Sequence, residues 1–144
     1  MRLFKAFISG MLLPSVIMPF ILFYFSVNDP IVLQKLPSLY FGGWAWGFWN
    51  ILFIITKKYV AINDRNIKIG VYGAVYGLFT VLINSFYFEF TSVLSSISDS
   101  FIIWYFIIYP VILYFVWKYI VNALNLIFEV YWFKKRGRYN ENCN

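Results

Sequence analysis

The sequence contains no histidine, a single cysteine and few charged residues. Charged residues make up 12% of its 144 residues, against about 25% in typical soluble domains. The absence of histidine excludes histidine-dependent catalysis and histidine metal sites. Cys143 has no second cysteine with which to form a disulfide within the chain. We therefore expect no metal and no cofactor.

Signatures of the common catalytic and transport classes are also missing. The sequence has no HExxH, GxSxG or P-loop motif, and its VYG repeats are not the TVGYG filter of potassium channels. No nucleophile–base pair is visible, so we do not expect an enzyme. No acidic residue lies in the middle of an apolar segment, which argues against a proton-driven antiporter built on one intramembrane acid.

Apolar residues dominate what is present. The chain is 62% hydrophobic and 24% aromatic, and a soluble domain of this size could not bury so much apolar surface. A helix needs about 20 apolar residues to cross a hydrocarbon core. The sequence therefore predicts an all-α integral membrane bundle of four transmembrane helices, at about 6–27, 39–56, 69–88 and 101–120.

The sequence also predicts the structure of the segments between and beyond these spans. Residues 31–36 are predicted to form a short interfacial helix, and 91–100 a serine-rich outer loop. The last apolar stretch is longer than one span requires, so we expect it to continue as a cytoplasmic helix. Residues 1–133 then form a single domain, and 134–144 form a basic polar tail. The first span lacks a following small-x-small cleavage site, so we interpret it as a retained helix and not as a signal peptide.

The distribution of cations predicts the orientation. Apart from Lys35 and Lys118, every lysine and arginine falls on one side of a four-span arrangement. Positively charged loops stay in the cytoplasm, so both termini are predicted to be cytoplasmic, in the plasma membrane or a bacterial inner membrane. The same rule accounts for the net charge of +6, and we do not expect nucleic acid as a partner.

Glycines at a spacing of four mark predicted helix-packing faces. Small residues let helix backbones approach closely in lipid, where packing replaces the hydrophobic effect. Because the second and third spans run in opposite directions, their glycine pairs should lie at different depths. Gly10 of the first span has a depth that suits the pair in the third span. The predicted packing residues are Gly10, Gly43, Gly47, Gly73 and Gly77.

A small polar set within the apolar segments is the candidate site. Four of its members recur at spacings of four, three and four, which places them on one helix face. One interpretation is that the lysine snorkels to the interface and the asparagines form interhelical hydrogen bonds. The alternative is a polar cleft, open to the cytoplasm, that binds an anionic headgroup or solute. The set comprises Asn50, Asn84, Lys118, Asn122, Asn125 and Glu129.

Two functions remain open from the sequence. The first is a small multi-pass protein that acts by interaction, as an accessory subunit, assembly factor or inhibitor of another membrane protein. The alternative is an oligomeric solute or lipid transporter, or a channel subunit, with the cytoplasm-facing polar cleft. The expected partners are the lipid bilayer and either another membrane protein or further copies of this chain.

Overall fold

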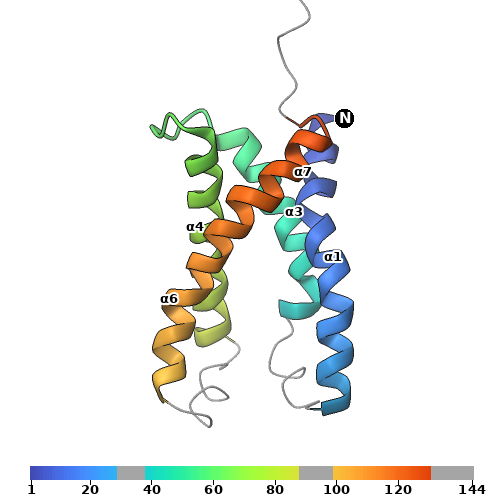
Figure 1. Cartoon of the computed structure of the whole chain (residues 1–144), viewed down its shortest axis with the longest axis vertical. Helices are drawn as coiled ribbons and strands as arrows, with labels where there is room; N and C mark the ends of the chain where they lie inside the picture. Colours follow the sequence, from blue (N-terminus) through green and yellow to red (C-terminus); the bar gives the residue numbers. More distant parts are fainter. Residues whose placement is uncertain (29–37, 88–98, 131–144) are drawn as a thin grey trace, which may run out of the picture.

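Most of the residues that the structure describes are helical. The computed structural model describes residues 1–28, 38–87 and 99–130, and no strand occurs among them. Figure 1 shows the helices as two pairs that meet near the N-terminus. In chain order the elements are α1 (Arg2–Asn28), α3 (Ser38–Thr56), α4 (Arg65–Phe86), α6 (Asp99–Val116), the π-helical segment η1 (Trp117–Val121) and α7 (Asn122–Ile127).

Within the described ranges, three helical stretches are long and apolar enough to cross a membrane, namely 2–28, 65–86 and 102–127. They confirm the prediction of helices apolar and long enough to span a membrane within the first, third and last apolar segments. The last stretch continues past residue 120 through η1 and α7, as the excess length of that segment predicted. The second predicted span coincides in position with α3, which is not among these three stretches. The predicted interfacial helix at 31–36, most of the loop at 91–100 and the tail at 134–144 lie outside the described residues.

Local hydrogen bonds mark where α4 begins and where α7 ends. The Asp64 side chain caps α4 by accepting hydrogen bonds from the backbone N–H groups of Asn66 and Ile67, at 2.7 and 3.4 Å. At the end of α7, Val130 N donates to the Asn125 carbonyl oxygen at 2.8 Å, and Glu129 N donates to the Leu126 carbonyl oxygen at 3.0 Å. This pair of bonds defines a Schellman motif. Glu129 occupies its left-handed position, with φ 55°.

The first pair of helices, α1 and α3, packs through glycines. A Cβ added at Gly10 would lie 2.7 Å from the Trp46 carbonyl oxygen, and one at Gly47 would lie 2.6 Å from the Phe7 ring. Both distances are too short for a real side chain. Gly43 is looser, since its Cβ would lie 3.4 Å from Ser15 Oγ. Gly10 therefore packs on α3, and not at the glycines of α4 that its predicted depth matched.

The second pair, α4 and α6 with η1, uses the glycines of α4. A Cβ at Gly73 would come within 2.5 Å of the Leu113 carbonyl oxygen and of Trp117 Cβ, and one at Gly77 within 2.8 Å of Pro110 Cα. Backbone contacts of this kind leave no room for a methyl group. The predicted packing residues Gly73 and Gly77 thus lie at close approaches between these helices.

Aromatic side chains join the two pairs of helices. Each of three rings contacts the other two, with centroids 6.0 to 6.2 Å apart: Trp46 on α3, Tyr76 on α4 and Trp117 on η1. Trp49 adds a hydrogen bond from its indole Nε1 to the Tyr72 carbonyl oxygen, at 2.9 Å. In Figure 1 the rod formed by α6, η1 and α7 crosses from α4 to the start of α1. The two pairs therefore meet in the half of the molecule that holds the N-terminus.

Candidate functional site

Three polar side chains from three helices form a buried cluster. Ser9 on α1, Asn50 on α3 and Asn125 on α7 each have an exposed fraction of 0%. Asn50 Nδ2 donates to Asn125 Oδ1 at 2.8 Å, and Asn125 Nδ2 donates to Asn50 Oδ1 at 3.0 Å. Ser9 Oγ lies 2.5 Å from Asn125 Oδ1 and 2.9 Å from Asn50 Nδ2. We call these three residues the amide cluster.

The amide cluster also reaches the backbone of α1. Asn50 Nδ2 lies 2.7 Å from the Ala6 carbonyl oxygen, a group that Ser9 Oγ also contacts at 3.0 Å. An unpaired amide is costly in an apolar interior, and mutual hydrogen bonding removes that cost. The cluster is thus a fully buried interhelical connection, and its polar atoms hydrogen-bond to one another.

Cations from three parts of the chain gather at one end of the molecule, which we call the basic end. Burial, followed by the positive charges of Arg2, Arg65 and Lys68, lowers the pKa of Lys57. Lys68 Nζ also donates to the Lys57 carbonyl oxygen at 3.0 Å. These contacts place the start of α1, the end of α3 and the start of α4 at the same level.

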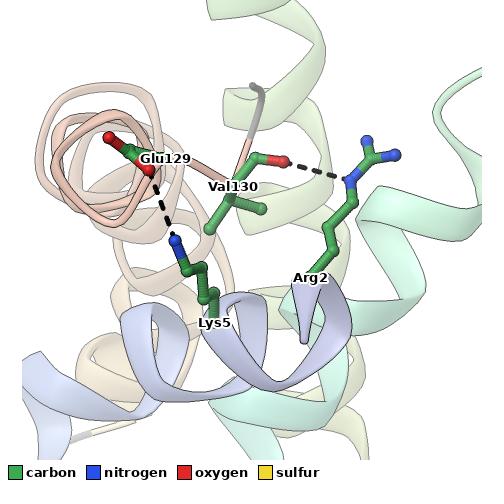
Figure 2. A network of polar contacts seen from close by, with 4 residues as sticks. All are labelled: Arg2, Lys5, Glu129 and Val130. Atoms are coloured by element: carbon green, nitrogen blue, oxygen red, sulfur yellow. Dashed lines mark hydrogen bonds and ion pairs between the residues drawn. The ribbon is translucent and has the colours of Figure 1, made fainter. Parts of the chain in front are cut away.

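The end of α7 is attached to this basic end, as Figure 2 shows. Arg2 Nε donates to the Val130 carbonyl oxygen at 3.1 Å, and Lys5 Nζ lies 3.4 Å from Glu129 Oε2. Val130 itself is fully buried. The Lys5–Glu129 pair is exposed, so it contributes little on its own. The Schellman turn and the start of α1 nonetheless form one connected unit.

A separate pocket lies where η1 and α7 meet the first turn of α4. Its volume is about 170 Å³. Lys118 Nζ stands 5.5 and 5.4 Å from the ring centres of Tyr114 and Tyr119, and Asn122 Nδ2 donates to Asn66 Oδ1 at 2.8 Å. Six residues line the pocket: Asn66, Lys118, Tyr119, Asn122, Ala123 and Leu126.

The structure distributes the six predicted polar residues over four places. Asn50 and Asn125 belong to the amide cluster, whereas Lys118 and Asn122 line the pocket. Glu129 pairs with Lys5 in the turn after α7. Asn84 is buried on α4, where its Nδ2 donates to Tyr105 Oη at 3.3 Å.

Sequence reasoning missed Ser9 and Asn66. Ser9 is one hydroxyl in a long apolar helix, and nothing local distinguishes it from a serine that bonds only to its own helix. Asn66 belongs to a polar loop in the sequence, and only the tertiary fold brings it against Asn122. A signal for Ser9 was available in its position beside Gly10, since small residues mark close helix contacts.

The architecture places the protein in a broad class: the part of the chain that the structure describes is helical, and three of its helices are apolar and long enough to span a membrane. Among the described residues, no group of three or more acidic, histidine or cysteine side chains could hold a metal ion. Comparison with protein-family models, with curated proteins and with solved structures finds no match to this chain.

Proposed function

We propose that this is a multi-pass protein with four spans and both termini in the cytoplasm, which acts by binding another membrane protein. It would serve as an accessory subunit, assembly factor or inhibitor. One observation carries this proposal: the amide cluster uses the interior polar groups to hold α1, α3 and α7 together. A transport pathway between these helices would need polar groups that face water.

The gathering of cations at the basic end supports the proposed orientation. Arg2, Lys57, Arg65 and Lys68 lie close enough for the other three charges to lower the pKa of Lys57. Such clusters remain on the cytoplasmic side of a membrane. Reporter fusions after Ser98 should therefore be active outside, and fusions after Asn63 should be active in the cytoplasm. An external location for a fusion at the C-terminus would contradict four spans.

The interaction itself is tested by site-specific photocrosslinking in native membranes. A photoreactive residue is placed at exposed positions on two helices, Phe20 and Phe23 of α1 and Ile103 and Ile107 of α6. If the chain binds another membrane protein, the photoreactive residues on one of these helices should crosslink to one defined membrane protein. Those on the other helix should not. Crosslinks to lipid alone from all four positions, in membranes of the natural host, would contradict the proposal.

The alternative, an oligomeric transporter or channel subunit, is favoured by the pocket beside Lys118. It predicts that the purified protein, with no partner present, forms an oligomer and conducts ions or moves solute in proteoliposomes. The interaction proposal predicts that the protein alone has no such activity.

A further inference from the structure

The pocket beside Lys118 lies at a defined depth in the molecule. The hydrogen bond between Asn122 and Asn66 sets α7 level with the first turn of α4, immediately after the cationic loop. Lys118 precedes Asn122 by one helical turn, which corresponds to about 6 Å along the axis at 1.5 Å per residue. The ammonium group therefore lies near the boundary between the cationic loop and the apolar part of α4.

The charge in this pocket has no acidic partner within the described part of the chain. No carboxylate there forms an ion pair with Lys118, whose neighbours are the rings of Tyr114 and Tyr119. Asn122 is 8% exposed, and its Oδ1 has no hydrogen-bond partner among the described residues. Turning both amides over would keep the bond to Asn66 and present an Asn122 N–H instead.

The backbone beside the pocket is also unusual, because it is π-helical. Lys118 and Tyr119 belong to the π-helical segment η1, whose hydrogen-bond pattern is rare and occurs frequently at functional sites. The pocket volume of about 170 Å³ far exceeds the roughly 10–15 Å³ that a single water needs. Its rim is apolar and exposed on one side, since Tyr119 and Leu126 are 60% and 49% exposed.

We propose that this pocket binds the phosphate group of an acidic phospholipid in the leaflet at the basic end. Lys118 contacts the phosphate oxygens, and the amides of Asn66 and Asn122 complete the polar side of the site. Tyr119 and Leu126 lie against the acyl chains. Basic pockets at this level of a membrane hold acidic headgroups. Inorganic phosphate shares the anionic chemistry, but the apolar rim favours the lipid. This proposal does not depend on the interaction function.

The test is a lipid titration of the purified full-length protein in a neutral detergent, followed by native mass spectrometry. Dioleoylphosphatidylglycerol is the probe, and dioleoylphosphatidylcholine, which is zwitterionic with no net charge, is the comparison. Lys118→Met should weaken binding of the acidic lipid by about tenfold, as expected for loss of a charge-assisted hydrogen bond. Lys118→Arg should retain most of the affinity.

Lys58→Met is the matched control. Lys58 is an exposed cation at the same end, and its Nζ also lies over a tyrosine ring, 4.7 Å from the centre of Tyr59. The control should bind the acidic lipid as the unmodified protein does. An equal loss in both variants would show diffuse attraction to the basic end and would overturn the proposal.

Two further measurements complete the test. Ala123→Glu places a carboxylate on the exposed lining of the pocket, so it should abolish binding of phosphatidylglycerol without disturbing the core. Millimolar inorganic phosphate should not displace the lipid. Displacement by phosphate would instead identify a site for free phosphate, and unchanged binding by Ala123→Glu would place the lipid elsewhere. Either result would overturn the assignment.

Discussion

Asn50 and Asn125 exchange two hydrogen bonds between their amides, at 2.8 and 3.0 Å, in the interior of the protein. Asn50 belongs to the pair formed by α1 and α3, whereas Asn125 lies on α7, at the end of the rod that begins with α6. One reciprocal contact therefore connects the two pairs of helices. It does so where both side chains are completely buried.

Removing one amide of this contact should destabilise the protein, and removing both should cost less than the sum of the two single losses. Asn125→Leu leaves the buried Asn50 Oδ1 without the N–H that donates to it, at a cost of about 1–3 kcal/mol in the free energy of unfolding. The double variant Asn50→Leu with Asn125→Leu should cost less than the sum of the two single changes. Denaturation in detergent measures the three values. Strict additivity would mean that the amides act independently.

Two glycines with the same sequence signature should respond in opposite ways to alanine. Gly73→Ala forces a methyl group to within 2.5 Å of the Leu113 carbonyl oxygen, so it should destabilise the protein by about 1–3 kcal/mol. Gly43→Ala meets only ordinary contacts, at 3.4 Å or more. It should be neutral or stabilising by up to about 1 kcal/mol, because alanine favours the helix. Thermal unfolding of the matched pair in one detergent checks both, and equal effects would contradict the packing described.

The sequence predicted most of the helices and their tight contacts, but not which helices meet. Long apolar runs determine α1, α4 and the rod after Asp99, because their length alone suits a membrane. Gly47, Gly73 and Gly77 stand at close approaches, as their spacing predicted. Gly10 instead packs on α3. Helices that follow one another in the chain usually pack together, so the α1–α3 hairpin and not the matching depth on α4 determines this contact.

The four polar residues predicted to share one helix face show a second limit of prediction from the sequence. Lys118, Asn122, Asn125 and Glu129 share one face only if the helix is regular and long enough. The π-helical segment η1 changes the angular register after Val116, and α7 ends at Ile127. Glu129 then turns away in a left-handed conformation. Neither event has a local sequence signal, since Glu129 occupies a position where glycine is the usual residue.

Glu129 itself provides the next prediction. Its φ of 55° costs about 1 kcal/mol or more for a residue with a side chain, whereas its exposed pair with Lys5 contributes at most about 1 kcal/mol. Glu129→Gly should therefore leave stability unchanged or raise it. Glu129→Val, which is β-branched, should lower stability. Glu129→Gln isolates the loss of the ion pair, and its unfolding midpoint should stay near that of the unmodified protein. A glycine variant less stable than the valine variant would contradict the left-handed turn.

Lys57 should make the protein more stable as the pH rises. Burial and the charges of Arg2, Arg65 and Lys68 lower the pKa of Lys57 in the folded protein below the ordinary 10.5. Between the lowered pKa and 10.5 the unfolded chain binds more protons, so the free energy of unfolding rises with pH in that window. Lys57→Gln should remove this part of the rise and should stabilise the protein at neutral pH. Lys58→Gln, at an exposed neighbour, should do neither.

The most direct test of the interaction proposal is whether water reaches the amide cluster. Ser9→Cys changes one atom of that cluster, in a background with Cys143→Ser, and a water-soluble thiol reagent is applied from the side of the basic end. Lys58→Cys serves as the accessible reference. A dry interhelical connection predicts that the Ser9→Cys variant remains unlabelled while the Lys58→Cys variant is labelled completely. Labelling of both at the same rate would reveal a hydrated path through the interior, which would contradict the interaction account and favour transport.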